Sequence, residues 1–325
     1  MRTIAIEEHF LAEAFKESTM KTTQGGGSNA PQWEKLADLG STRLKEMDAG
    51  GIDLQVISHT TSGVVPVPGE EGIRLAREAN DQLAAAISAH PTRFAGFAIL
   101  PMAEPQAAAD ELERAVHSLG LKGAVINGTT NGRFLDDPTF FPILERAVAL
   151  DVPIYIHPAV PPAAVREAYY SGFDSAVSFT LSTSAWGWHS EVGIHALRLI
   201  LAGVFDRLPT LQIIIGHMGE MIPFMLARIN NVLTPVAKNL QRPVPDYFLQ
   251  NFFITTSGFF TDPPLLLALQ VMGADRIIFA VDYPYSTNEQ GKAFLDRAFI
   301  SPADKEKISH RNAERLLKLA PAQSS

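Results

Sequence analysis

The chain contains no cysteine among its 325 residues, which excludes disulfide bonds, thiolate metal ligands and cysteine nucleophiles. It also lacks long apolar runs, and no uninterrupted stretch approaches the roughly 20 residues of a membrane-spanning helix. Positive charge is in deficit, with 27 Lys and Arg against 35 Asp and Glu and a formal net charge of −8. That balance argues against nucleic acid or an anionic membrane as the main partner.

Sequence signals for nucleotide binding and for export are missing as well. No G-x-G-x-x-G or Walker loop follows any expected strand, so we expect no nucleotide or other organic cofactor. The N-terminus runs from one arginine directly into Glu7, Glu8 and His9, which is not typical of a secretory signal. We therefore expect a cytoplasmic protein, and its 46% of apolar residues suffice for a sizeable core.

Short apolar segments alternate with helical patterns along the chain. The expected strands are residues 1–9, 52–58, 93–100, 123–127, 153–157, 211–217, 252–256 and 277–282. Such alternation predicts a parallel sheet, and eight strands in this length favour the α/β class as a closed (β/α)₈ TIM barrel over an open doubly wound sheet. We expect a single barrel domain over residues 1–320, followed by a frayed tail over 321–325.

Two long excursions interrupt this alternation, after the first and the fifth strand. The first covers residues 11–40 and includes the segment Gly25–Ser28, and the second runs from Pro158 to about Thr183. Structureless loops of such length are usually either functional or disordered.

The first strand, Ile4–Phe10, carries two side chains of the kinds that bind metal ions. Regular alternation places Glu7 and His9 on one face, with the isoleucines of the strand on the opposite face. On this reasoning Glu7 is the functional glutamate and Glu8 is not. A carboxylate and an imidazole that project together from the end of an apolar strand form half of a metal site.

Polar residues also stand at the C-terminal ends of several later strands, where barrel enzymes carry their catalytic groups. They are His59, Asn127, His157, His217, Ser257 and Asp282. Unpaired charge is costly at a buried strand end, so such residues need a partner or a metal. The set Glu7, His9, His157 and Asp282 offers nitrogen and oxygen donors that suit one divalent ion, Zn²⁺ or Mn²⁺, and leaves positions open for water or substrate.

His217 lies in the segment Gly216–Glu220, and we expect it to act as an acid/base or anion-stabilising residue beside the metal. Glu220 has two interpretations: it orients His217, or it is a charge at the start of a helix. Arg228, two turns along the same helix, is either a clamp for a carboxylate or an ordinary surface charge.

Several aromatic residues flank the expected rim of the barrel. The candidates for contact with a flat aromatic substrate are Phe10, His59, Trp188 and Tyr285. Such residues more often pack than bind, and both interpretations stay open for them. His195 lies on an apolar helix, where a hydrogen-bonded core histidine is expected, while His189 is open between packing and binding.

Four motifs together resemble a known family. They are Ile6–Phe10, Tyr155–Pro158, Gly216–Glu220 and Phe279–Tyr285. They resemble the amidohydrolase-related metal-dependent decarboxylases, the branch that contains aminocarboxymuconate semialdehyde decarboxylase and gamma-resorcylate (2,6-dihydroxybenzoate) decarboxylase. The resemblance extends over nearly the whole chain, and departs from the family at Ser286, at His59 and over residues 160–185.

The resemblance implies a function and a set of roles. Glu7, His9, His157 and Asp282 would be the metal ligands, with His217 a catalytic neighbour and Arg228 a substrate contact. The implied reaction is nonoxidative decarboxylation of a hydroxylated aromatic carboxylate, such as a dihydroxybenzoate, by a homodimer or homotetramer.

Asp282 is the expected proton donor, because the ring carbon must be protonated before carbon dioxide leaves. The ordinary pKa of an aspartate, near 3.9, is too low for an acid at neutral pH. Burial raises that pKa and a metal ion lowers it, so the assignment depends on which effect is larger.

Two other functions compete with decarboxylation. In a metal-dependent hydrolase of an ester, lactone or amide, the same ligands would serve and Asp282 would deprotonate a metal-bound water. Hydrolytic relatives usually begin with a His-x-His pair, so the pair Glu7 and His9 favours decarboxylation. A binding protein that has lost catalysis is the third interpretation, and the intact set of polar strand ends argues against it.

Overall fold

A computed structural model of the chain describes residues 1–16, 30–60 and 67–321. The segment Gly25–Ser28 and the tail residues 322–325 lie outside the described residues, so the predictions made for them stay untested. Among the helices that the structure describes, none is both long and apolar enough to cross a membrane.

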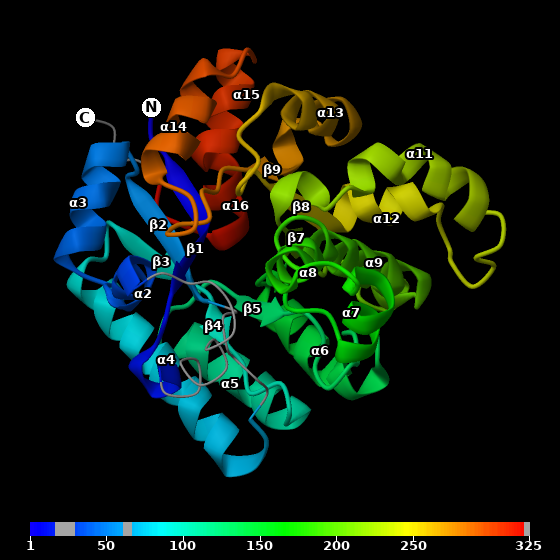
Figure 1. Ribbon diagram of the computed structural model, residues 1–325, viewed down its shortest axis with the longest axis horizontal. Helices are drawn as coiled ribbons and strands as arrows, with labels where there is room; N and C mark the ends of the chain where they lie inside the picture. Colours follow the sequence, from blue (N-terminus) through cyan, green and yellow to red (C-terminus); the bar gives the residue numbers. More distant parts are fainter. Residues whose placement is uncertain (17–29, 61–66, 322–325) are drawn as a thin grey trace.

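Parallel strands form the centre of the molecule (Figure 1). They are β1 (Ile4–Phe10), β2 (Leu54–His59), β3 (Phe94–Gly96), β4 (Ala98–Ile99), β5 (Ala124–Asn127), β6 (Ile154–His157), β7 (Ile213–Ile215), β8 (Phe252–Thr255) and β9 (Ile277–Ile278). The strands pair in chain order, from β1 to β3 and from β4 to β9, and every pairing between them is parallel. Neighbours that follow one another in the chain are typical of a (β/α)₈ barrel.

Backbone hydrogen bonds join the two sets of strands at both seams. At the first seam, β3 and β4 are halves of one strand interrupted at Phe97, whose N–H donates to the carbonyl oxygen of Ile57 at 2.9 Å. At the second seam, the N–H of Ile6 donates to the carbonyl oxygen of Phe279 at 3.1 Å. The expected barrel is confirmed, with its third strand broken in two.

Helices surround these strands (Figure 1). They are α2 (Ala30–Ala37), α3 (Ser41–Gly50), α4 (Gly69–Ala89), α5 (Pro105–His117), α6 (Phe141–Leu150), α7 (Ala163–Tyr170), α8 (Ser175–Ser182), α9 (Gly187–Leu201), α10 (Val204–Arg207), α11 (Ile222–Leu233), α12 (Val244–Asn251), α13 (Asp262–Met272), α14 (Asn288–Arg297), α15 (Pro302–Glu306) and α16 (Asn312–Leu317). Short 3₁₀-helical turns are η1 (Glu13–Phe15), η2 (Pro138–Phe140), η3 (His217–Gly219) and η4 (Ala274–Arg276), and η5 (Lys307–Arg311) is a π-helical turn. Both excursions contain helices, because α2 lies in the first and α7 and α8 occupy most of the second.

The core has two layers, one inside the barrel and one between the strands and the helices. The inner layer includes Ile4, Ile6, Val56, Phe97, Tyr155, Ile214, Phe253 and Ile278. Ala313 and Leu317 of α16 pack against these residues. The outer layer is larger and takes the alternate residues of the same strands, such as Ala5, Ile57 and Ile254. Apolar burial on both faces of each strand is the expected condition of a parallel barrel.

Strand β1 departs from regular alternation at Glu7. The φ angle of Glu7 is 75°, and the register of β1 on β2 shifts at the same point. Ile4 and Ile6 therefore pack inside the barrel with Tyr155, and the expectation that they face away from Glu7 is wrong. The bulge inserts one residue, so that Glu7 and His9 both turn inward at the top of the strand. Bulges commonly re-aim side chains next to active sites.

Candidate metal centre and active site

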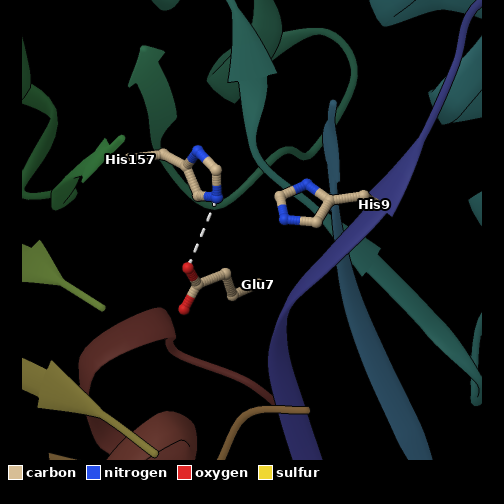
Figure 2. A group of neighbouring side chains, drawn as sticks. All are labelled: Glu7, His9 and His157. Carbon is tan, nitrogen blue, oxygen red and sulfur yellow. Dashed lines mark ion pairs between the residues drawn. The ribbon is translucent and has the colours of Figure 1, made fainter. Parts of the chain in front are cut away.

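Glu7, His9 and His157 form a buried group where β1 and β6 end (Figure 2). One donor atom of each residue lies within 4.8 Å of the donor atoms of the other two. The closest pair joins Nε2 of His157 to Oε1 of Glu7 at 3.5 Å, and none of the three residues is more than 5% exposed. The side chains converge from two strands that are distant in sequence but parallel in the barrel.

The carboxylate of Glu7 has one occupied and one free oxygen. Its Oε2 accepts hydrogen bonds from the hydroxyl groups of Tyr155 and, at 2.8 Å, Thr255. Its Oε1 is buried and has no hydrogen-bond partner among the described residues. Buried polar atoms are rarely left unpaired, so the free oxygen fits a position for a cation.

The two histidines of this group also have a free nitrogen directed into it. Nδ1 of His9 lies 3.3 Å from Oγ of Ser58, and its Nε2 has no hydrogen-bond partner among the described residues. Nδ1 of His157 donates to the carbonyl oxygen of Pro158 at 2.9 Å, which leaves the lone pair on Nε2. Burial lowers the pKa of His9 to about 4 and that of His157 to about 3. Both rings are therefore neutral at pH 7, as metal ligands must be.

Gly216 provides the space for the carboxylate of Glu7. A Cβ atom at position 216 would lie 2.8 Å from Oε1 and 3.1 Å from Oε2 of Glu7. Real Cβ atoms do not approach a carboxylate so closely, so a larger residue at position 216 would displace the carboxylate of Glu7. The glycine that precedes His217 thus contributes to the metal group on another strand.

Asp282 lies beside His9 at the edge of the group. Its Oδ1 is 3.2 Å from Nε2 of His9, and its side chain retains 18% exposure. Burial raises the pKa of Asp282 to about 7, although His217 and His189 act to lower it. The structure thus gathers three of the four predicted ligands and places Asp282 against one of them, and ligation by Asp282 stays a prediction.

A second buried group consists of His217, Glu220 and His189. Glu220 accepts hydrogen bonds on both oxygens, from Nδ1 of His217 at 2.7 Å and from Nδ1 of His189 at 2.6 Å. Nε2 of His217 lies 3.9 Å from Oε1 of Glu7, which connects the two groups. The three residues are also spaced to hold an ion, but hydrogen bonds already occupy both oxygens of Glu220.

The charges in this second group follow from its contacts. Burial acts to lower the pKa of His217, but the carboxylates of Glu220 and Glu7 outweigh it and raise the pKa to about 10. Burial acts to raise the pKa of Glu220, but the two histidines lower it to about 2. A cation held by Glu7 would weaken the negative field at His217. The structure places Glu220 against the imidazole and not at an exposed helix start.

The backbone around His217 is strained. His217, Met218, Glu220 and Met221 all have positive φ angles, between 49° and 66°. Residues other than glycine adopt this conformation at a cost of about 1–3 kcal/mol each, and such residues cluster at functional sites.

Phe10 and His59 face the outer layer of the core. Their ring centroids are 5.3 Å apart, and the ring of Phe15 lies 4.9 Å from that of His59. Their strand neighbours His9 and Ser58 meet inside the barrel, so alternation turns Phe10 and His59 the other way. The prediction that these two residues contact the substrate receives no support from this placement.

The structure tells different things about the other three candidate substrate contacts. Tyr285 packs its ring 5.7 Å from that of His9, and its hydroxyl pairs with Thr60 at 2.6 Å. Trp188 is half-buried at the start of α9, and its indole N–H has no hydrogen-bond partner among the described residues. Arg228 is exposed on α11. Their roles stay predictions.

Sequence analysis missed several residues that hold the site together. Tyr155 precedes His157 by two positions in one strand, so its spacing alone could have placed its hydroxyl on the inner face. Thr255 ends β8 and could have been found in the same way. The pairing of His189 with Glu220 has no sequence signal, because α9 and the segment after β7 meet only in the fold.

Comparison with known proteins identifies the family. The model of the family described as amidohydrolase matches residues 9–319. The chain belongs to the amidohydrolase family. The chain is 39% identical to the decarboxylase orsB of Emericella nidulans, over 97% of each chain. It is 38% identical to gamma-resorcylate decarboxylase of Rhizobium sp., over 97% of this chain and 98% of the relative.

A solved structure gives the same result for the fold and adds a metal. A dihydroxybenzoic acid decarboxylase from Polaromonas sp., with bound manganese and the inhibitor 2-nitroresorcinol, superposes on this chain with a TM-score of 0.88. The two are 35% identical, and the match covers 99% of this chain and 98% of the other. The family resemblance expected from the four motifs is confirmed.

Proposed function

We propose that the protein is a metal-dependent nonoxidative decarboxylase whose substrate is a hydroxylated aromatic carboxylate, such as a dihydroxybenzoate. The observation that carries this proposal is the buried group of Glu7, His9 and His157, each with a free donor atom directed into the group. The substrate class is supported by the relatives, which include a gamma-resorcylate decarboxylase and a dihydroxybenzoic acid decarboxylase.

Glu7, His9 and His157 would hold one divalent ion, with Asp282 as a fourth ligand. Their nitrogen and oxygen atoms suit Zn²⁺ and Mn²⁺ alike, and the relative from Polaromonas holds manganese. When bound, the ion supplies positive charge that fixes an anionic substrate and stabilises the charge that develops on it.

The reaction exchanges a carbon–carbon bond for a carbon–hydrogen bond. A proton adds to the ring carbon that carries the carboxylate; the bond to the carboxylate then breaks, and its electron pair restores the aromatic ring as carbon dioxide leaves. Asp282 is the proposed donor, because its Oδ1 lies at the edge of the metal group, 3.2 Å from Nε2 of His9, and burial raises its pKa, although a bound ion would act to lower it.

His217 would carry positive charge next to the developing anion and return a proton to the site after each turnover. Glu220 holds it for this task through the hydrogen bond to Nδ1, which leaves Nε2 directed towards Glu7. Tyr285 and Trp188 are proposed to flank the ring of the substrate, and Arg228 to bind its carboxylate.

Self-association belongs to the same proposal. Tyr169 on α7 and Phe224 on α11 are each 75% exposed, so an interface that included α7 or α11 would bury aromatic surface. We retain a homodimer or homotetramer as the proposed assembly and a cytoplasmic location as the proposed compartment.

The test is a product assay on protein loaded with Mn²⁺ or Zn²⁺. We expect carbon dioxide in the headspace and the matching phenol in solution from at least one dihydroxybenzoate. Acid release from lactones or esters, without carbon dioxide from any hydroxybenzoate, would instead identify a hydrolase on the same ligands.

A further inference from the structure

We propose that Glu8, the glutamate without a place in the metal group, is a positioning residue that fixes the backbone of Asp282. This inference rests on the proposed function, because Asp282 is the proton donor in that proposal. Glu8 is fully buried, and its side chain takes no part in the contacts of the metal group described above.

The carboxyl group of Glu8 brackets Asp282 along the chain. Oε1 accepts a hydrogen bond from the N–H of Val281 at 2.9 Å, and Oε2 accepts one from the N–H of Tyr283 at 3.0 Å. The N–H of His9 donates to the carbonyl oxygen of Tyr283 at 2.7 Å. One side chain and one amide of β1 thus hold the residues on both sides of Asp282.

These bonds replace part of the strand ladder that the bulge at Glu7 interrupts. Below the bulge, the N–H of Ile6 pairs with the carbonyl oxygen of Phe279 in the ordinary parallel pattern. Beyond the bulge, the amides of Val281 and Tyr283 would be left without backbone acceptors, and a buried amide without an acceptor destabilises the fold. The carboxyl group of Glu8 accepts from both, so the bulge that turns Glu7 inward also makes Glu8 necessary.

Arg43, which is also buried, contacts both the end of β1 and the segment around Asp282. Arg43 donates from Nη2 to the carbonyl oxygen of His9 at 2.5 Å and from Nη1 to Oε1 of Gln55 at 3.2 Å. Its guanidinium group lies over the ring of Tyr283, 4.7 Å from the centroid. Arg43 is also the positive charge that acts on Glu8. The end of β1 and the segment around Asp282 therefore form one buried polar unit.

The conformation of Asp282 explains why it needs such support. Its φ angle of 72° lies in the left-handed region, which a residue with a Cβ adopts only when its surroundings hold it there. The carboxylate that results lies 3.2 Å from His9. Misplacement of a catalytic group by about 1 Å can cost on the order of 10²-fold in rate, so loss of the bracket is expected to lower the rate while leaving the metal group in place.

Glu8→Gln is the sharpest variant, because it keeps the shape of the side chain. An amide nitrogen cannot accept a hydrogen bond, whatever the protonation state of the carboxyl group it replaces, so one of the two bracketing amides loses its partner. Glu111→Gln is the matched control. Glu111 is equally buried and accepts hydrogen bonds from Asn80 and Arg114, but it lies on α5, away from the metal group.

We expect Glu8→Gln to bind about one Mn²⁺ per chain, as does the wild type, and to lose about 10–100-fold in kcat, a typical cost for a residue that orients a metal site. Its KM for a dihydroxybenzoate should change by less than about threefold. Glu111→Gln should lower the melting temperature without lowering kcat. Equal kcat in Glu8→Gln and the wild type would overturn the proposal, as would a loss of kcat that Glu111→Gln reproduces.

A second measurement needs neither a variant nor an active enzyme. In wild-type protein, we expect the amides of Val281 and Tyr283 to exchange with solvent deuterium as slowly as those of the barrel strands. Rapid exchange at either amide would overturn the bracket. If the wild type releases no carbon dioxide while these amides are protected, the proposed function fails and the structural role of Glu8 stands.

Discussion

Oδ1 of Asp282 lies 3.2 Å from Nε2 of His9, so the proposed proton donor touches a proposed metal ligand. This contact makes Asp282→Asn informative, because the amide keeps the size of the side chain but cannot donate a carboxylic proton. We predict that the variant keeps its metal through Glu7, His9 and His157 and loses at least about 100-fold in kcat. Metal content and single-turnover rates provide the measurement. A metal-loaded variant with a near wild-type rate would remove Asp282 from the role of donor.

Substitutions of the two adjacent glutamates, Glu7 and Glu8, should differ in their effect on the metal content of the protein. Glu7→Ala removes the carboxylate whose free oxygen faces His157 and should abolish stoichiometric metal binding. Glu8→Ala leaves every atom of the metal group intact and should keep the ion after loading with Mn²⁺. Elemental analysis of both proteins after gel filtration gives the result. Loss of metal from the Glu8 variant alone would show that the bulge has been placed incorrectly.

Space beside Glu7 is as important as its charge. Gly216→Ala would bring a methyl group to 2.8 Å from Oε1 of Glu7, so the carboxylate must move. We predict weaker Mn²⁺ binding, by about 10–100-fold, in a protein that still folds. Titration of Mn²⁺ followed by electron paramagnetic resonance measures this directly. An unchanged dissociation constant would mean that Glu7 does not bind the ion through this oxygen.

Protonation of His195 should make the free energy of unfolding depend on pH, independently of catalysis. Its Nε2 accepts a hydrogen bond from the N–H of Leu135 at 2.9 Å, and burial lowers its pKa to about 3. The core position expected from its apolar helix is confirmed. Because the unfolded chain binds a proton near pH 6.5 and the folded chain does not, stability is complete above that pH and falls as the pH is lowered towards 3.

Between pH 7.5 and pH 5 this single group should cost about 2 kcal/mol of unfolding free energy. Other buried histidines add to the total, so the comparison is with His195→Gln, whose side chain can accept the same hydrogen bond without titrating. Urea unfolding at both pH values should show the smaller loss in the variant. Identical losses would place the pKa of His195 near its ordinary value.

The sequence was sufficient to predict the barrel and the residues that converge on the metal group. Parallel strands in chain order bring their C-terminal ends to one rim, so His9 and His157 were expected at the same rim once the strands were located. The same reasoning failed for β1 itself. Alternation alone put the isoleucines of β1 on the wrong face, because nothing in the order of residues 4–10 marks the bulge that turns Glu7 inward.

Contacts between segments that are distant in the chain also could not be predicted from the sequence. Glu220 was open between two roles until the fold placed both its oxygens against imidazoles, one of them on α9. The role of Glu8 depends on amides some 270 positions later in the chain, and no local pattern reports such a pairing. Phe10 and His59 were candidates by position at the rim, but the direction of their side chains depends on strand phase.

The most direct test of the central claim is decarboxylation in deuterium oxide of a dihydroxybenzoate labelled with carbon-13 in the carboxyl group. Protein reloaded with Mn²⁺ after chelation should release labelled carbon dioxide and leave one deuterium on the ring carbon that carried the carboxylate, while the chelated protein should do neither. No labelled carbon dioxide from the reloaded protein with any dihydroxybenzoate, or equal release from the chelated protein, would contradict metal-dependent nonoxidative decarboxylation.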